Sequence, residues 1–204
     1  MLRDSIAPLV QRFVNSVSVL DGGCGRGEFL ELARESGIDA YGVEQDVAMV
    51  ALCRHKALNV VEADLLEHLQ MLSDNTLGGM FLSHVIEHLT PRQQMRLVEL
   101  VNQKLKPGAW FAILTPNPVC LLAMATHFAI DPTHLRPVHP DYAKFILRAA
   151  GFVQIEFIPM SPTAEELRLQ LSDGRMTQNQ NLNKLNDLLF GYQDYALLAR
   201  KEAI

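Results

Sequence analysis

A glycine-rich turn near the amino terminus carries the first residues that indicate chemistry. It follows an apolar run and has the sequence Asp21-Gly22-Gly23-Cys24-Gly25-Arg26-Gly27. Glycines between a strand and a helix let the backbone approach a ligand closely, because no Cβ atom stands in the way. A second apolar run ends at the carboxylate of Glu44. This arrangement is typical of an α/β sheet that holds an adenosine, although the glycines alone also fit a tight structural turn.

The spacing of the glycines separates two classes of adenosine cofactor. A nicotinamide dinucleotide site needs G-x-G-x-x-G, in which the third glycine lets helix and strand pack closely. Here Glu28 stands in that place, and its negative charge at the start of a helix would oppose a pyrophosphate. We therefore predict an S-adenosylmethionine site, in which Asp21 orients the ammonium group and Glu44 accepts hydrogen bonds from both ribose hydroxyls. The residues assigned to it from the two motifs are Asp21, Gly22, Gly23, Gly25, Gly27 and Glu44.

Three further motifs follow in the order expected of one family. They are Glu62-Ala63-Asp64-Leu65, His84-Val85-Ile86-Glu87-His88-Leu89 and Leu105-Lys106-Pro107-Gly108-Ala109. With them the chain resembles the class I S-adenosylmethionine-dependent methyltransferases, which have a Rossmann-like fold, over nearly its whole length. The resemblance implies that Asp64 binds the adenine amino group and that the Leu65 amide binds a ring nitrogen. It also implies that Gln45 flanks the adenine and that His84 lies under the methionine portion.

The segment His84-x-x-Glu87-His88 also fits a second chemistry. H-x-x-E-H is the pattern of inverted zinc peptidases, in which two histidines one helical turn apart bind the metal. That ligation requires the motif to lie within a helix, whereas here a buried strand precedes it and Thr90 begins the next helix only afterwards. We therefore assign no metal ligand. Glu87 and His88 either anchor the loop or contact the substrate.

A loop rich in proline and histidine, residues 131–140, is the second feature that indicates chemistry. Its sequence is D-P-T-H-L-R-P-V-H-P, and we expect it to overhang the site as a substrate loop. His134 or His139 would take the proton of a sugar hydroxyl, because a neutral imidazole is present at cellular pH. For a phosphate acceptor, Arg136 and the histidines would hold the anionic oxygen. The structural alternative is that Asp131 and His139 cap helices and that Arg136 pairs with a surface carboxylate.

The same loop sharpens the resemblance. Its pattern, the turn Ala150-Gly151-Phe152 and the tail 185–196 are similar to bacterial methyltransferases associated with surface-polysaccharide and O-antigen biosynthesis. This resemblance implies methyl transfer to an oxygen of a glycan or lipid-linked glycan, with His134, Arg136 and His139 as catalytic residues. Two alternatives stay open. One is a small-molecule or lipid or quinone-precursor acceptor, and the other is a non-catalytic module that only binds S-adenosylmethionine.

Composition narrows the partners and the compartment. Eighteen Lys and Arg residues stand against 23 Asp and Glu residues, a net charge of -5, which disfavours nucleic acid as a substrate. The three cysteines form no C-x-x-C pair, and no signal-like segment precedes the first strand, so we expect a reducing cytoplasm. The apolar run 119–130 is too short to cross a bilayer. Peripheral membrane contact and a homodimer both stay open.

The elements that must position these residues follow from apolar periodicity. We expect seven strands near 17–21, 38–44, 58–62, 78–84, 109–114, 152–158 and 192–200. Helices are expected near 4–15, 27–36, 46–56, 91–105 and 140–149. The helix near 91–105 begins with Thr90 as N-cap and Gln93 at the capping-box position. Its sheet-facing stripe is predicted to be Met95, Val98, Val101 and Leu105.

These elements specify one α/β domain over 1–204. The expected fold is a doubly wound, mostly parallel seven-stranded sheet with an antiparallel last strand, as in the Rossmann-like class I methyltransferases. We expect a cap helix within 1–16, a substrate-loop insertion at 115–140 and a helical or mobile insertion at 160–190. Within the last of these, the polar stretch 172–183 is expected to be mobile.

Overall fold

Seven strands form a single sheet in the computed structural model, which describes residues 2–173 and 176–203. Their order across the sheet is β3-β2-β1-β4-β5-β7-β6. The strands are β1 Val19–Gly22, β2 Ala40–Glu44, β3 Val60–Glu62, β4 Leu77–Ser83, β5 Leu105–Pro116, β6 Phe152–Pro162 and β7 Tyr192–Lys201. All neighbours from β3 to β5 pair in parallel, and β7 runs antiparallel to both β5 and β6. The predicted mostly parallel sheet with an antiparallel last strand is confirmed.

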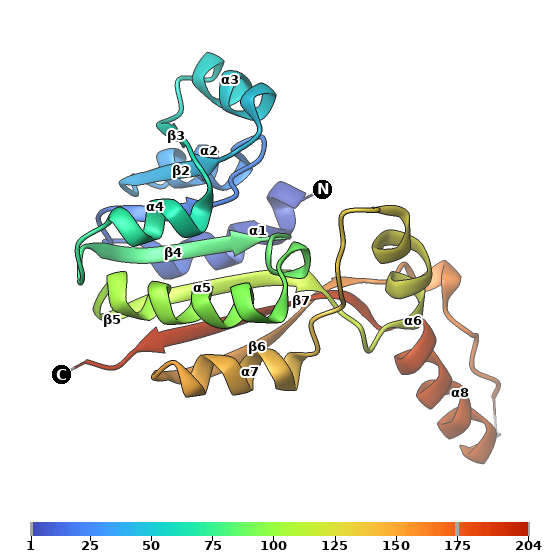
Figure 1. Ribbon diagram of the computed structural model, residues 1–204. Coiled ribbons are helices and arrows are strands. Elements are labelled where there is room, and N and C mark those ends of the chain that lie inside the picture. The colour runs from blue at the N-terminus through green and yellow to red at the C-terminus, as the bar shows by residue number, and fades with distance from the viewer. Residues whose placement is uncertain (1, 174–175, 204) are drawn as a thin grey trace.

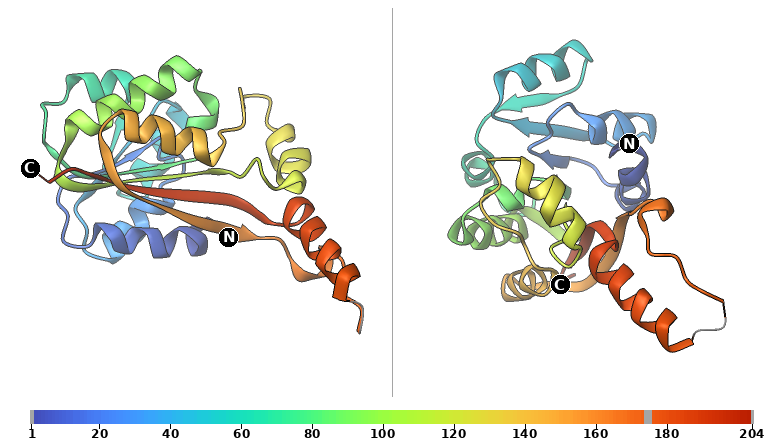
Figure 2. Two further views of the ribbon diagram at one scale, coloured as in Figure 1. Left: turned by 90° about the horizontal axis from the view of Figure 1, so that it is seen from below. Right: turned by 90° about the vertical axis from the view of Figure 1, so that its right-hand side faces the viewer.

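Helices cover both faces of this sheet (Figures 1 and 2). One face carries α1 Leu2–Val10, followed by the 3-10 turn η1 Gln11–Phe13, with α2 Glu28–Glu35 and α3 Val47–His55. The other face carries α4 Leu65–Met71, α5 Pro91–Lys104 and α7 Pro140–Ala149. Because strand side chains alternate, successive residues enter different cores: Leu20 packs with α4 and α5, and Val19 packs with α1 and α2. Burial on both faces explains why the strands are almost continuously apolar.

Helix α5 begins as predicted, and the predicted stripe is right for Val98, Val101 and Leu105, which are buried, but wrong for Met95. Thr90 and Gln93 form the full capping box. Met95 is 50% exposed, however, and Leu105 is already the first residue of β5. The buried face includes Gln94, Leu97, Val98, Leu100 and Val101. The prediction missed Gln94 because a polar residue does not signal burial, yet its amide donates to the carbonyls of Ile86 and Leu89 and so fixes the turn after β4.

Two insertions extend beyond the carboxyl edge of the sheet (Figure 1). The first, after β5, contains α6 Leu121–Ala123 and the π-helical turn η3 Met124–Phe128. The second, after β6, contains η4 Glu165–Leu167 and α8 Met176–Leu189. Part of the stretch expected to be mobile is therefore helical, while residues 174–175 of it lie outside the described residues. None of the described helices is long and apolar enough to span a membrane.

Buried polar contacts hold helix α8 to the rest of the insertion. The polar composition of this segment did not predict them. The Asn186 side chain is buried and bonds the backbone of Leu169 through both its oxygen and its nitrogen. Arg168 donates to the Phe190 carbonyl at 2.7 Å. These contacts tie the end of α8 to the segment before it, and the expected mobility of 172–183 stays a prediction.

Candidate active site

The glycine turn connects β1 to α2 in a backbone conformation that favours glycine. The φ angles of Gly23, Gly25 and Gly27 are 67°, 51° and 81°. A Cβ atom on Gly23 would lie 2.5 Å from Val85 Cγ2, and one on Gly27 would lie 2.5 Å from Leu58 Cδ1. A Cβ atom on Gly25 would meet nothing within 4 Å. Gly23 and Gly27 therefore serve packing, whereas Gly25 faces open space where a ligand can approach.

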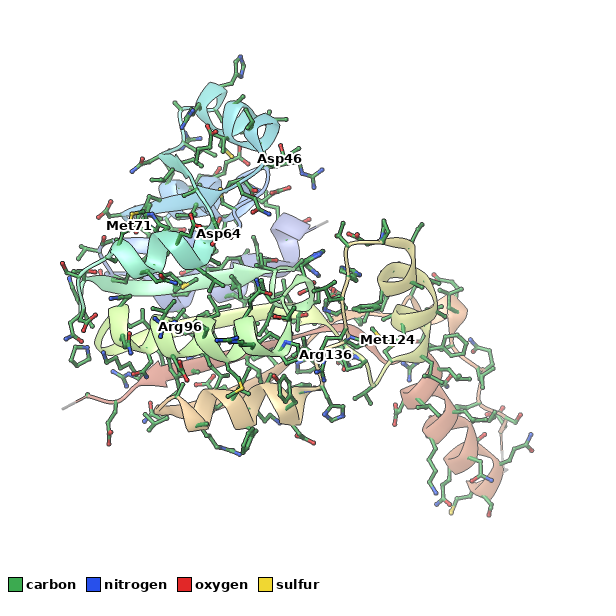
Figure 3. All side chains as sticks on the ribbon, in the orientation of Figure 1. Asp46, Asp64, Met71, Arg96, Met124 and Arg136 are labelled. Atoms are coloured by element: carbon green, nitrogen blue, oxygen red, sulfur yellow. The ribbon has the colours of Figure 1, made fainter. Side chains whose placement is uncertain are left out.

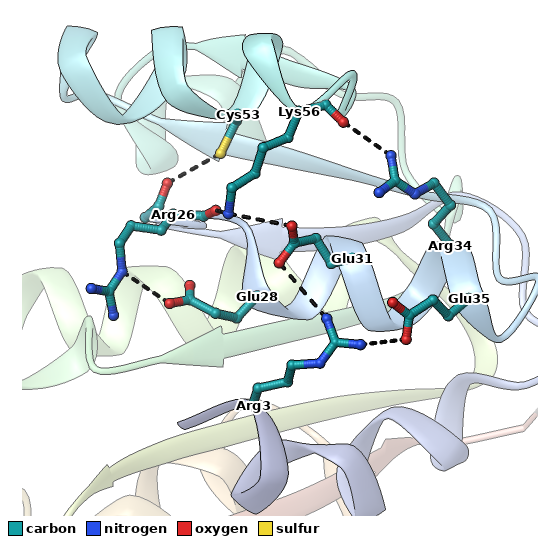
Figure 4. A network of polar contacts seen from close by, with 9 residues as sticks. Arg3, Arg26, Glu28, Glu31, Arg34, Glu35, Cys53 and Lys56 are labelled. Carbon is teal, nitrogen blue, oxygen red and sulfur yellow. Dashed lines mark hydrogen bonds and ion pairs between the residues drawn. The ribbon is translucent and has the colours of Figure 1, made fainter. Parts of the chain in front are cut away.

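A polar network behind the turn holds it in place (Figure 4). The Lys56 ammonium donates to the Arg26 carbonyl at 2.8 Å and pairs with Glu31 at 3.3 Å. Cys53 donates to the Gly25 carbonyl at 3.2 Å. The Gly25 amide itself donates to Glu44 Oε2 at 2.9 Å. The turn is thus fixed from behind before any ligand binds.

Two adjoining cavities open at the carboxyl edge of the sheet, where the turn lies. The larger measures about 860 Å³, and the smaller, about 380 Å³, shares Gly23, Gly25 and His84 with it. We call one part of the larger cavity the glycine-turn end, lined by Gly23, Gly25, Glu44, Gln45, Asp64 and Leu65. We call the other part the histidine end, lined by His84, His88, Asp131 and Thr133. Asp21 lines the smaller cavity.

Glu44 is fixed by backbone amides at the glycine-turn end. Its Oε2 accepts from the Gly25 amide at 2.9 Å, and its Oε1 accepts from the amides of Gln45 and Asp46 at 2.8 and 2.9 Å. A carboxylate has about four acceptor positions, so one remains, on Oε2. To accept from two ribose hydroxyls, Glu44 would also have to use an Oε1 position that already accepts a hydrogen bond from a backbone amide.

Asp64 plays a structural part and leaves donors and acceptors beside it. It is the N-cap of α4, where its Oδ1 accepts from the amides of Leu66 and Glu67 at 2.8 and 3.0 Å. Leu65 is the first residue of the helix, so its amide has no carbonyl partner within the helix. Figure 3 shows Asp64 at the start of α4, on the side facing Asp46. The pair offers one carboxylate oxygen and one amide to a ligand.

Asp21 is a buried carboxyl beside the smaller cavity. It is 3% exposed, and among the described residues no donor makes a hydrogen bond to its side chain. Burial raises its pKa well above the usual range, and the negative charges of Glu28 and Glu44 raise it further. A positively charged ligand group in the cavity would stabilise the ionised carboxylate and so lower this pKa again. The site therefore favours a cation at this position.

A carboxylate and three histidines meet beside the histidine end: His84 and His88 line the larger cavity, whereas Glu87 and His134 are not among its lining residues. Glu87, in the 3-10 turn η2 Ile86–His88, is fully buried and accepts from the Thr115 hydroxyl at 2.9 Å. Its Oε1 lies 3.3 Å from His84 Nδ1 and 3.9 Å from His134 Nε2. Burial lowers the pKa of His84, but the hydrogen bond and charge of Glu87, aided by Asp194, raise it overall. The sequence left Glu87 as either a loop anchor or a substrate contact and did not predict that it would meet His134.

Loop 131–140 contributes one of its three predicted catalytic residues to this cluster. His134 packs against Glu87, and the Glu87 carbonyl accepts from the Leu135 amide at 3.0 Å. The exposed Arg136 lies over the Tyr142 ring at 5.3 Å, near α7 (Figure 3). His139 is exposed and caps α7, accepting from the Asp141 amide at 3.2 Å. Neither Arg136 nor His139 lines the two cavities.

The glycine turn, the acidic strand ends and the cavities agree with the comparison to known families. A sequence profile described as a methyltransferase domain matches residues 1–156. The chain belongs to this methyltransferase family. It is an S-adenosylmethionine-dependent enzyme, and the buried Asp21 carboxyl and the open side of Gly25 fit a cofactor with a cationic amino-acid end.

Solved structures of other methyltransferases are similar to this methyltransferase over nearly its whole length. An S-adenosylmethionine-dependent methyltransferase from Archaeoglobus fulgidus is 39% identical, with a TM-score of 0.94 over 98% of this chain and 93% of that one. A possible histamine N-methyltransferase from Thermotoga maritima is 15% identical, with a TM-score of 0.70 and coverage of 98% and 89%. Phosphoethanolamine N-methyltransferase 2 of Haemonchus contortus, solved with S-adenosyl-L-methionine, is 17% identical, with a TM-score of 0.69 and coverage of 96% and 52%. The last two show likeness of fold alone. No protein with a curated description matches the chain.

Proposed function

We propose that this methyltransferase transfers its methyl group to an oxygen of a glycan or glycan-linked acceptor, and that a sugar hydroxyl is the acceptor group. The observation that carries the proposal is the buried Glu87 with its neighbouring imidazoles at the histidine end of the cavity. A hydroxyl must lose its proton as it is methylated, and this cluster supplies basic groups for that step. The loop pattern at 131–140 supports a glycan acceptor.

The glycine-turn end is proposed to hold the cofactor, which supplies an electrophilic methyl group on a sulfonium. Asp21 binds the ammonium group, and the free position of Glu44 Oε2 accepts from the ribose. Asp64 Oδ2 and the Leu65 amide bind the adenine edge, with Gln45 beside it. The donors and acceptors that remain unused in the structure match this set of ligand groups.

The histidine end favours a hydroxyl over a phosphate as the acceptor. Among the described residues that line the larger cavity there is no lysine or arginine to hold an anionic phosphate. The one arginine of the loop, Arg136, is exposed beside Tyr142 rather than turned into the cavity. We propose that Arg136 and His139 contact outer parts of a large acceptor, because both lie exposed on the loop that also carries His134.

A reducing compartment is part of the proposal. Cys24, Cys53 and Cys120 are all free and buried, which fits a cytoplasmic enzyme that forms no disulfide.

The test uses S-adenosylmethionine labelled with carbon-13 in its methyl group. The enzyme is incubated with polysaccharide, lipid-linked glycan and small-molecule extracts, and the labelled product is examined by NMR. We expect a methyl ether on a sugar, whose methyl protons show no coupling to phosphorus. Phosphorus coupling would overturn the hydroxyl assignment, and transfer to small molecules alone would overturn the glycan assignment.

A further inference from the structure

Three side chains at the histidine end carry the ligand atoms of a metal site. One oxygen of Glu87 and one ring nitrogen each of His88 and His134 lie within 4.8 Å of one another. We propose that these three residues bind a divalent transition-metal cation, which holds the acceptor hydroxyl and promotes the loss of its proton. The catalytic role rests on the proposed function, whereas the binding site rests on the geometry of the cluster.

The first observation is a buried oxygen that the protein satisfies poorly. Glu87 is fully buried and its Oε2 accepts from Thr115, whereas the donor nearest to its Oε1 is His84 Nδ1, a long and poorly aligned contact of 3.3 Å. A buried carboxylate oxygen without a well-formed hydrogen bond is costly unless a cation or a better-placed donor meets it. Its 3.9 Å separation from His134 Nε2 is too long for a hydrogen bond. Two atoms that share one cation, each about 2.1 Å from it, are separated by roughly 3 to 4 Å.

The second observation is the orientation of His134. Its Nδ1 lies 2.9 Å from the Phe128 carbonyl oxygen, which can only accept, so Nδ1 carries the hydrogen of the neutral ring. The lone pair is therefore on Nε2, the atom nearest to Glu87. Histidines that bind metals commonly donate their other ring nitrogen to a carbonyl in this way. Stacking of Phe128 on the ring, with centroids 4.5 Å apart, fixes its position further.

The third observation is a chain of hydrogen bonds that orients His88. The Thr133 hydroxyl donates its only hydrogen to Asp131 Oδ1 at 2.6 Å. In its 2.9 Å contact with His88 Nδ1 the hydroxyl oxygen must therefore be the acceptor. Nδ1 is then the donor and carries the hydrogen of the neutral His88 ring. Nε2 of His88 is left with a lone pair, as in His134. Asp131 Oδ2 lies 3.9 Å from His134 Nε2 and can become a fourth ligand.

This ligand set indicates the kind of cation. Two imidazole nitrogens and one or two carboxylate oxygens suit Zn²⁺, Co²⁺ or Fe²⁺ better than Mg²⁺, which prefers oxygen ligands and water. The trio differs from the two histidines of the H-x-x-E-H pattern, because His84 is replaced by His134 from a distant loop. A ligand separation as large as 4.8 Å must close by about 1 Å around a bound ion.

The position of the site allows the cation to act on the acceptor. His88 and Asp131 line the larger cavity, so a coordination position on that side is open to an acceptor oxygen. A coordinated hydroxyl loses its proton more readily, and the proton passes to solvent. The oxygen then forms a bond to the methyl carbon as the carbon–sulfur bond breaks, and the sulfur keeps the electron pair. The methyl ether and the neutral thioether are the products.

The test measures cation binding without any acceptor. Tag-free protein is stripped with a chelator, dialysed and titrated calorimetrically with Zn²⁺ and with Co²⁺, and the metal retained after gel filtration is measured by mass spectrometry. We expect one equivalent per chain. His134→Ala and His88→Ala should each bind at least about tenfold more weakly. His127→Ala, which changes an exposed histidine near the loop, should bind as the wild type does.

Glu87→Gln provides a fourth variant, which keeps the shape of the side chain but removes its charge. Circular dichroism and calorimetric binding of S-adenosylmethionine show whether each variant is folded. Retention of less than one tenth of an equivalent by the wild type, or equal affinity in the wild type and in folded His134→Ala and His88→Ala, would overturn the cation site. Methyl transfer that persists in chelated enzyme would overturn the catalytic role of the cation while leaving the proposed function intact. Tight cation binding without transfer to any extract would instead contradict the proposed function alone.

Discussion

The two ends of the cavity are built in different ways. At the glycine-turn end, backbone amides and carboxylates come from β1, β2 and the start of α4, each within a few residues of a strand end. At the histidine end, Glu87, Thr115 and His134 come from three separate segments. The first end recognises a ligand by local backbone geometry, and the second by side chains that only the tertiary fold brings together.

This difference decides how specific each end can be. Local backbone geometry of this kind suits a ligand that enzymes with different acceptors have in common. The glycine-turn end is therefore suited to the shared cofactor. A side-chain cluster that depends on an inserted loop can change without altering the sheet. We therefore propose that η2 and the loop 131–140 determine the acceptor preference, and variants at the two ends should then affect different steps.

The largest effect is expected from His134→Ala. In the proposed function this imidazole acts as a basic group, and with a cation bound it acts instead as a ligand. Its loss removes either role, so kcat should fall by about a hundredfold or more. The Kd for S-adenosylmethionine, measured by calorimetry, should hardly change, because His134 is not among the residues that line the glycine-turn end. His127→Ala is the matched control. A loss of cofactor affinity in His134→Ala as large as the loss in kcat would mean that the two ends do not act separately.

Asp21→Asn should have the next largest effect, and on binding. A charge-assisted hydrogen bond contributes about 1.5 to 3 kcal/mol, so the Kd for S-adenosylmethionine should rise about ten- to a hundredfold. At a saturating cofactor concentration, kcat should fall much less. Calorimetry and steady-state kinetics together separate these two quantities, and an unchanged Kd would show that Asp21 does not bind the ammonium group.

The same variant should alter how stability depends on pH. The pKa of Asp21 in the folded protein lies above its unfolded value, mainly because the group is buried. Its contribution to stability is therefore fully present below the unfolded pKa and is lost as the pH rises through the folded pKa. Without cofactor, thermal unfolding of Asp21→Asn should show a smaller loss of stability between pH 5 and pH 8 than the wild type. An equal loss in both proteins would mean that the carboxyl is not desolvated.

Gly25→Ala should have a smaller effect at the same end. A Cβ atom meets nothing within 4 Å in the folded protein, so it would project into open space beside Glu44. Gly37→Ala is a close control, since Gly37 also has a positive φ, 69°, and open space around its Cβ position but lines neither of the two cavities. Both variants should lose about 1 to 2 kcal/mol of stability. Only Gly25→Ala should weaken cofactor binding, and equal binding in both would place the cofactor elsewhere.

The sequence predicted the sheet and the glycine-turn end because both depend on local patterns. Strand periodicity and the turn glycines are encoded within short segments, and Glu44 and Asp64 follow directly from strand ends. The histidine end was predicted only in part. His139 has the same residue type as His134, yet it caps α7, which was the structural alternative for this residue. Burial of Gln94 and Asn186 likewise depends on backbone partners outside their own helices, in the turn before α5 and at Leu169.

Arg136→Ala should have the smallest effect and sharpens the description of the histidine end. The guanidinium is exposed over Tyr142, an arrangement that contributes about 0.5 to 1 kcal/mol. We expect KM for a large glycan acceptor to rise a few-fold, with kcat and cofactor Kd nearly unchanged, because Arg136 touches only outer parts of the acceptor. Arg148→Ala, an exposed arginine on α7, is the control. A fall in kcat as large as that of His134→Ala would mean that the loop rearranges to bring Arg136 into the cavity, and the hydroxyl assignment would then give way to a phosphate.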